Sequence, residues 1–239
     1  MKLLAVDSSG MTASVAILEN DLITAEYTVN YKKTHSQTLL PMLEEIAGMI
    51  ELDLSSVDAI AVAAGPGSFT GLRIGSAMVK GLAEALNKPI IPIPTVDGLA
   101  ANLYATDKLI CPIMDARRNQ TYTGLYEYVK SDNGFEQKCL EPQCAVAITD
   151  IIEKINELGK EVIFLGDGVP VFKEIIGENI RVPYSFAPAS CNRQRAAALA
   201  VLAVKAYKEG KTESAVEHAP DYLRLSQAER ERNEAQKEC

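Results

Sequence analysis

The sequence predicts a mixed α/β fold in which helices and strands alternate after an opening group of strands. Three short apolar runs within residues 2–29, separated by turn residues, are typical of consecutive strands. The apolar run over residues 59–64 is typical of a strand buried on both faces. Apolar residues at helical spacing predict helices over residues 36–52 and 69–86.

The first hundred residues contain the clearest signals. Strands are predicted at 2–8, 12–18 and 22–29, and their short loops favour an antiparallel meander. The remaining elements of this part are a helix at 36–52, a strand at 59–64, a helix at 69–86, a strand at 89–93 and a helix at 96–104. Pro41 requires the first helix to begin near residues 36–38 or to bend there. This order predicts a lobe of the ribonuclease-H type, with helices on the faces of a mixed sheet.

A polar stretch at residues 106–108 divides the chain into two predicted lobes, 1–105 and 106–225. The second lobe repeats strand and helix signals more loosely: strands at 109–114, 121–129 and 161–165, and helices at 150–158, 169–176 and 192–208. Gly210 is expected to end the last helix. Residues 226–239 are highly charged and are expected to form a loose tail.

Composition excludes several classes of protein. With 239 residues and 47% hydrophobic content, the chain can bury one large core or two lobes. A net charge of -8 argues against a free-standing nucleic-acid binder, because phosphate contacts need clustered Lys and Arg. The five cysteines form no C-x-x-C motif, which favours a reduced, cytoplasmic protein. We expect neither a signal peptide nor a membrane span.

Two glycine-containing turns are candidate phosphate sites. The first, Asp7-Ser8-Ser9-Gly10, could wrap a phosphate with its amides, so Asp7, Ser9 and Gly10 are weak candidates for nucleotide binding. The alternative is a tight turn in which Asp and Ser cap their own backbone. The second, residues 65–68, precedes a helix for which Ser68 is the expected N-cap. It lacks the Lys-Ser/Thr of a Walker A loop.

Glycines at 71, 75 and 81 are costly inside the second helix, at roughly 1 kcal/mol each. Something must therefore approach the helix closely, and Gly75 and Gly81 lie too far from its start to contact an anion. We favour a second helix, because small residues permit close helix packing. The substitution Gly75→Leu is then expected to leave the monomer folded or mildly weakened and to abolish partner binding.

Nucleophilic and metal chemistry have little support. His35 and His218 are the only histidines, and neither belongs to a metal-binding or hydrolase motif. His35 is expected to cap the helix that follows it. In M-D-A-R-R-N-Q, Asp115, Arg117 and Arg118 form either a turn stabilised by an Asp–Arg pair or a ligand contact.

Five segments resemble the bacterial TsaB (YeaZ) family: LLAVDSSG, HSQTLLPMLEEI, AVAAGPGSFTGLRIGSAMVKGLAEALNKPIIPI, MDARRNQTYTGLY and PDYLR. The resemblance spans nearly the whole chain and is most specific in GPGSFTGLRIG. It implies two ribonuclease-H-like lobes of the actin/Hsp70/sugar-kinase type. It also implies a role in making threonylcarbamoyladenosine in tRNA, as a degenerate paralogue of the transferase subunit TsaD.

The resemblance further implies loss of catalysis. TsaD holds a metal through H-x-x-x-H, and Thr95 and Leu99 occupy the matching positions here. In the G-D-G turn at 166–168, Asp167 stands where a phosphate would approach. A non-catalytic dimerisation subunit is therefore expected, with no cofactor or metal of its own, although ATP or ADP could bind at its interface with TsaD. The alternatives are an ATP-dependent transferase or kinase and a peptidase, each acting alone.

The two helices after the meander are the partner face that the resemblance implies. They would bind TsaD, or a second copy of the chain, with TsaE joining the assembly and tRNA contacted only through the complex. Met42, Met49 and Met78 suit an adaptable surface of this kind. The alternative for about half of these apolar positions is burial within this chain, because a two-lobe core must also be filled. The candidate interface residues are Leu39, Met42, Leu43, Ile46, Met49, Ile50, Gly71, Leu72, Gly75, Met78, Val79 and Leu82.

Overall fold

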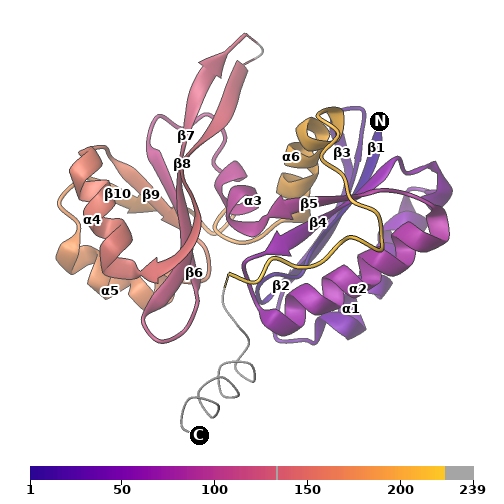
Figure 1. Cartoon of the computed structure of the whole chain (residues 1–239), viewed down its shortest axis with the longest axis horizontal. Coiled ribbons are helices and arrows are strands. Elements are labelled where there is room, and N and C mark those ends of the chain that lie inside the picture. The colour runs from indigo at the N-terminus through magenta and orange to yellow at the C-terminus, as the bar shows by residue number, and fades with distance from the viewer. Residues whose placement is uncertain (133, 224–239) are drawn as a thin grey trace, which may run out of the picture.

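Two lobes make up the chain, each built on a five-stranded sheet (Figure 1). The structure is a computed structural model that describes residues 1–132 and 134–223. The predicted tail at 226–239 lies outside the described residues.

The first sheet is formed by the predicted meander and two further strands. Its order is β3-β2-β1-β4-β5, with β1, β2 and β3 antiparallel and β4 and β5 parallel to β1. The meander is therefore confirmed. The elements of this part are β1 (Lys2–Asp7), β2 (Thr12–Glu19), β3 (Leu22–Asn30), α1 (His35–Met49), a 3₁₀ turn (Leu54–Ser56), β4 (Ala59–Gly65), α2 (Phe69–Leu86), β5 (Ile90–Pro94) and α3 (Thr95–Ala101).

The second sheet repeats this topology. Its order is β10-β9-β6-β7-β8, so its first strand again pairs with an antiparallel hairpin on one side and parallel strands on the other. This repetition confirms the prediction of two ribonuclease-H-like lobes. The elements are β6 (Leu109–Asp115), β7 (Gln120–Ser131), β8 (Gly134–Ala147), α4 (Ile148–Leu158), β9 (Val162–Leu165), α5 (Val169–Asn179), β10 (Tyr184–Phe186) and α6 (Ala196–Lys208).

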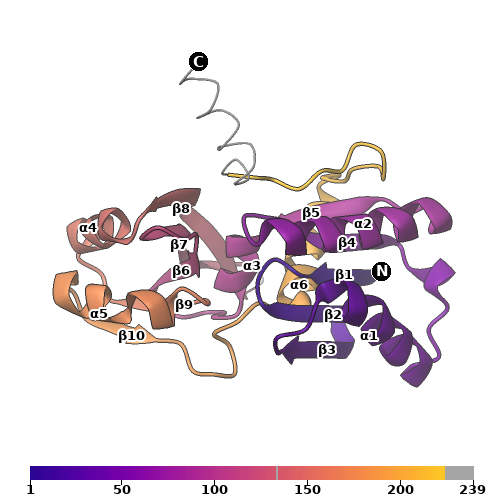
Figure 2. The ribbon, with the colours of Figure 1, turned by 90° about the horizontal axis from the view of Figure 1, so that it is seen from below.

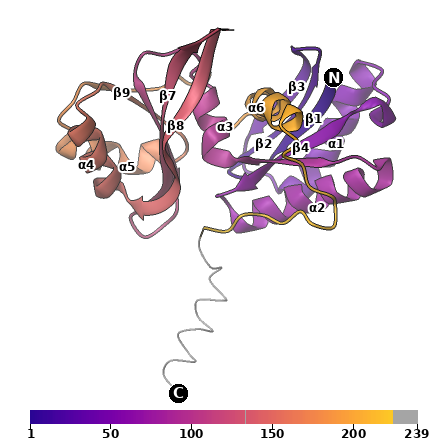
Figure 3. The same cartoon turned by 45° about the horizontal axis from the view of Figure 1, so that its top comes forward.

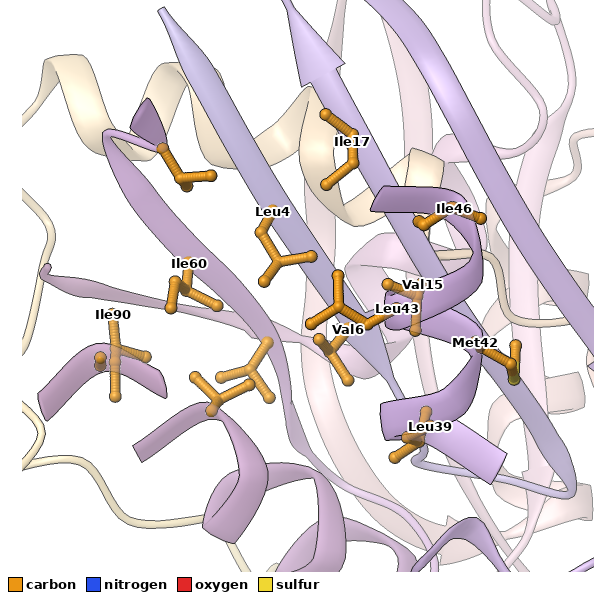
Figure 4. Close-up of a cluster of buried hydrophobic side chains, with 14 of the residues drawn as sticks. Leu4, Val6, Val15, Ile17, Leu39, Met42, Leu43, Ile46, Ile60 and Ile90 are labelled. Carbon is orange, nitrogen blue, oxygen red and sulfur yellow. The ribbon is translucent and has the colours of Figure 1, made fainter. Parts of the chain in front are cut away.

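Side chains that alternate along the first sheet build two separate cores. Those on one face, including Leu4, Val6 and Ile60, pack against α1 and α2 (Figure 4). Those on the other face, including Leu3 and Ala61, pack against α6. Continuous apolar strands such as β4 follow from this arrangement, because both faces of the sheet are covered.

The last helix of each half packs on the sheet of the other half. Helix α6, from the end of the chain, covers β1, β2, β4 and β5, whereas α3 packs against Ile110, Met114 and Leu165 of the second sheet. The two helices lie against each other between the sheets (Figure 3). Helix α3 also contacts β4 and β5 of the first sheet, so both helices lie where the two halves of the chain meet. Composition marks a boundary in the chain and not the sheet that an apolar helix covers.

Some elements differ from the prediction. Helix α1 begins at His35 and continues through Pro41, which lies in its interior. Strand β8 was not predicted, because its polar and charged residues pair only with β7 at the sheet edge. The short strand β10 was also missed. Gly210, with a φ of 71°, follows α6 as expected.

Candidate functional site

The turn between β1 and β2 is held by its own side chains. Oδ1 of Asp7 accepts hydrogen bonds from the Ser9 amide at 2.9 Å and from Ser9 Oγ at 2.6 Å. Burial raises the pKa of Asp7, and the bonds from Ser9 oppose that shift. The turn thus has the self-capped geometry, which commits Asp7 and Ser9 to each other.

The loop at residues 65–68 packs directly on this turn. The Ser68 amide donates to the Ser9 carbonyl at 2.7 Å, and a Cβ on Gly67 would lie 2.3 Å from the same oxygen. Ser68 Oγ accepts from the Gly71 amide, which confirms Ser68 as the N-cap of α2. The two loops therefore pack against each other at the Ser9 carbonyl, and Ser9, Gly67 and Ser68 also line the larger cavity described below.

The close neighbour of the helix glycines is the same turn. A Cβ on Gly71 would lie 2.1 Å from the Ser8 carbonyl oxygen, and one on Gly75 would lie 2.2 Å from Ser8 Oγ. Ser8 Oγ donates to the Gly71 carbonyl at 2.8 Å. The prediction that these two glycines admit a partner helix is therefore wrong. At Gly81 a Cβ would meet nothing within 4 Å.

Most of the predicted interface residues lie in the core of this chain. Those buried, and thus unavailable to a partner in this structure, are Leu39, Met42, Leu43, Ile46, Gly71, Leu72, Gly75 and Val79. Four remain at the surface: Met49 is 73% exposed, and Ile50, Met78 and Leu82 are partly exposed. A hydrophobic stripe marks the buried side of a helix first, which is why the sequence pointed to the wrong subset.

A shallow apolar groove of about 340 Å³ nevertheless runs between the two helices. We call it the α1–α2 groove. Leu40, which is 56% exposed, Ile74 and Ala77 belong to it and were not predicted. Its lining residues are His35, Ser36, Leu39, Leu40, Ile74, Ala77, Met78, Gly81 and Leu82. Gly81 is the one helix glycine among these lining residues, and its backbone is open to the groove.

A second cavity, of about 500 Å³, lies between the lobes. We call it the interlobe cleft. It is bounded by the β1–β2 turn, the loop before α2, the second lobe, and a strap at residues 213–223 that runs beside α2 (Figure 2). Gly10 lines it, and a Cβ there would lie 2.6 Å from Gln194.

The charges that line the interlobe cleft suit a nucleotide poorly. Asp115, Asp167 and Asp221 are carboxylates, and Arg117 is the one basic side chain among the described lining residues. Arg117 is 86% exposed and is bonded to Asp115 at 3.1 Å, so the turn-stabilising interpretation of that pair is the observed one. With Asp115 paired to Arg117, a free triphosphate would still meet the carboxylates of Asp167 and Asp221 here, so these residues suit it poorly.

The histidines form no hydrolytic pair. His35 is the first residue of α1, and its Nε2 donates to the Gly10 carbonyl at 2.8 Å, so the prediction that it caps the helix is wrong. His218 bonds Glu213. Thr95 and Leu99 are fully buried in α3. Across residues 1–132 and 134–223, no group of His, Cys, Asp or Glu is arranged to hold a metal ion.

Comparison with known proteins places this architecture in a family. The family model for TsaD, tRNA N6-adenosine threonylcarbamoyltransferase, matches residues 23–232. The chain is 36% identical to the tRNA threonylcarbamoyladenosine biosynthesis protein TsaB of Bacillus subtilis, over 99% of this chain and 100% of that one. It is 30% identical to TsaB of Escherichia coli, over 94% of this chain and 95% of that one.

A solved structure agrees with the sequence relatives. YeaZ from Pseudomonas aeruginosa superimposes with a TM-score of 0.76 at 27% identity, covering 93% of this chain and all of that one. The two-lobed architecture, the topology of both sheets and these near-complete alignments lead to one conclusion. The chain belongs to the TsaB family of tRNA threonylcarbamoyladenosine biosynthesis proteins, which is related to TsaD.

Proposed function

We propose that this chain is a non-catalytic subunit that binds TsaD through the α1–α2 groove and supports transfer of threonylcarbamoyl to tRNA adenosine. The groove carries the proposal: it is apolar, open, and continuous with exposed Leu40. A monomer gains nothing from leaving such side chains in water, whereas a partner helix would bury them. TsaE and a TsaC-type synthase would complete the reaction, and tRNA would be contacted through the complex.

The side chains in and near the interlobe cleft support a non-catalytic role for the chain. Asp7 and Ser9 are committed to each other, and the cleft is lined by carboxylates. Thr95 and Leu99, at the positions where the resemblance placed metal ligands, are in the core. We therefore propose that nucleotide and metal chemistry belong to the partner, with ATP or ADP bound at most where the two chains meet.

The test uses paired surface substitutions and purified TsaD. Leu40→Asp and Met78→Asp place a charge in the groove, and each should weaken co-elution with TsaD on the order of 100-fold, as for the anchors of other interfaces. Val171→Asp is the control, because Val171 is 54% exposed on α5 in the other lobe. Full TsaD binding by both groove variants would reassign the partner face.

Activity separates a supporting subunit from an enzyme. With TsaD, TsaE and the synthase present, tRNA modification should require this chain and should fall with the groove variants. Modification of tRNA by this chain alone would refute the non-catalytic role.

The groove also predicts self-association when TsaD is absent. Sedimentation of the isolated chain should show a dimer that Leu40→Asp converts to a monomer. We place this activity in the cytoplasm, where tRNA is modified. In the part of the chain that the structure covers, no helix combines the length and apolarity needed to cross a membrane.

A further inference from the structure

The interlobe cleft is a built cavity that the proposed function does not use. Its volume of about 500 Å³ is within the range of small-molecule sites. The strap crosses the cavity and is bonded to both lobes through Asp221. The Asp221 amide donates to the Ala64 carbonyl at 2.7 Å, and Gln143 Nε2 donates to Asp221 Oδ2 at 2.7 Å. One residue of the strap thus bridges the two lobes over the cavity.

The polar groups of the cleft favour positive charge. Asp115, Asp167 and Asp221 line it from three different segments, so the excess of carboxylates does not come from one local acidic run. Burial raises the pKa of Asp167, and its Oδ1 is buried without a hydrogen-bond partner. The guanidinium of nearby Arg193 donates to the carbonyls of Gly166 and Asn192. Oδ1 of Asp167 therefore lacks a donor, while backbone hydrogen bonds and the charge of Arg193 favour the ionised carboxylate.

Two of the backbone amides that could attract an anion are already engaged. The start of α2 faces the cleft through Ser68 and Phe69, but the Ser68 amide donates to Ser9 and the Gly71 amide to Ser68 Oγ. Arg117 is turned toward Asp115 and solvent. Of the three carboxylates, Asp115 is paired with Arg117 and Asp221 accepts a hydrogen bond from Gln143, whereas Oδ1 of Asp167 has no partner.

Aromatic side chains form another wall of the cleft. Phe69 and Tyr222 lie with ring centroids 4.8 Å apart, and Tyr122 lines the opposite lobe. The Phe69 ring already contacts one guanidinium, that of Arg73, at 4.1 Å from its centroid. Aromatic faces beside carboxylates attract amines and guanidines, because ring and carboxylate both favour positive charge.

We propose that the interlobe cleft binds a small aliphatic cation of the amine or guanidine class. The roof formed by the strap favours a compact free molecule over a side chain reaching in from another protein. Its cationic end would contact Asp167 and Asp221, and its methylene chain would lie against Phe69 and Tyr222. Such a ligand would connect the two lobes at the residues that the strap already joins.

The experiment is calorimetric titration of the full chain with agmatine, which carries both a guanidinium and an amine, and separately with magnesium-ATP. Agmatine should bind, and magnesium-ATP should give no heat in the same concentration range. Asp167→Asn and Asp221→Asn should each weaken agmatine binding about tenfold. Asp107→Asn, which removes an exposed carboxylate outside the cleft, should leave it unchanged.

Several outcomes would overturn the proposal. These are failure of the wild-type chain to bind agmatine at millimolar concentration, binding that persists in both cleft variants, and tighter binding of magnesium-ATP. Circular dichroism checks that Asp167→Asn folds. Asp221 is exposed, so Asp221→Asn provides a cleft variant that does not disturb the core. None of these results depends on TsaD, so the outcome is separate from that of the proposed function.

Discussion

Ser8 restricts positions 71 and 75 of helix α2 to glycine. Its carbonyl and hydroxyl oxygens occupy the space that side chains at Gly71 and Gly75 would need. Each interior glycine costs the helix roughly 1 kcal/mol, and close packing on a buried turn offsets that cost. The periodic glycines correctly indicated a close neighbour. They could not indicate that it lies more than sixty residues earlier in the same chain.

Gly75→Leu should therefore destabilise the monomer itself, and by more than the mild weakening expected from the sequence. Its side chain must displace Ser8, and overpacking of this kind costs about 2 kcal/mol or more. Gly81 lies in the same helix, but a Cβ there meets open space. Gly81→Ala should therefore raise the free energy of unfolding by up to about 1 kcal/mol. Urea unfolding of the two variants measures both effects. A wild-type midpoint for Gly75→Leu would contradict the packing described.

Asp97 makes the stability of the fold depend on pH. Burial raises its pKa, while the hydrogen bond from the Tyr126 hydroxyl, at 2.6 Å, opposes that shift. The stability contributed by the protonated carboxyl is complete below about pH 4, the usual pKa, and is lost as pH rises through the raised value.

Asp97→Asn should reduce this dependence. The amide oxygen still accepts from Tyr126, and the buried charge is gone, so the melting temperature should rise at pH 7 and change less between pH 4 and 7. Melting curves across that range test it, with exposed Asp107→Asn as the control. An unchanged pH slope would show that Asp97 does not titrate in this way.

The strap, residues 213–223, is a segment without helix or strand that is held to the first lobe by a few contacts. It is held by the Ile90–Glu213 bridge, by Lys80 donating to the His218 carbonyl, and by the packing of Tyr222 on Phe69. These contacts connect the strap with β5 at Ile90 and with α2 at Lys80 and Phe69. It is an element of low local stability over the cleft.

Tyr222→Ala should loosen the end of the strap without unfolding the lobes. It removes the ring contact with Phe69 and the bond from Arg73 to the hydroxyl, and aromatic pairs are worth about 0.5–1.5 kcal/mol. Hydrogen exchange at the Asp221 amide should accelerate up to about tenfold. Tyr31→Ala, at an exposed site before α1, should have no effect there.

Elements were predictable where local pattern and tertiary environment agree. The buried run of β4, the Ser68 cap and the stop at Gly210 are local signals, and each is found. Strand β8 carries charges on an edge, where pairing with β7 overrides its weak propensity. The α1–α2 groove was only partly predicted, because apolar spacing does not separate core-facing residues from those on the rim.

At the scale of the whole molecule, each half completes the core of the other. Helix α6 covers the first sheet with Leu199, Ala200 and Ala203, and α3 covers the second. Neither lobe is a self-sufficient unit in sequence order. The polar stretch at 106–108 resembled a linker but does not separate two independent cores.

A fragment of residues 1–105 should therefore fail to fold cooperatively. Without α6, one face of its sheet exposes Leu3, Leu18 and Ile91, all buried in the full chain. Each large side chain so exposed forfeits about 1.5–3 kcal/mol. Urea unfolding followed by circular dichroism should show a broad transition or aggregation. A sharp two-state transition for this fragment would contradict the interdependence of the lobes.

The packing of α6, which lies late in the chain, on the first sheet has a consequence for synthesis on the ribosome. Strands β1 to β5 leave the exit tunnel early, yet the helix that seals them is translated roughly a hundred residues later. At about 5–20 residues per second, that interval is of the order of several seconds. Throughout it, the nascent sheet displays an uncovered apolar face to chaperones and to its neighbours.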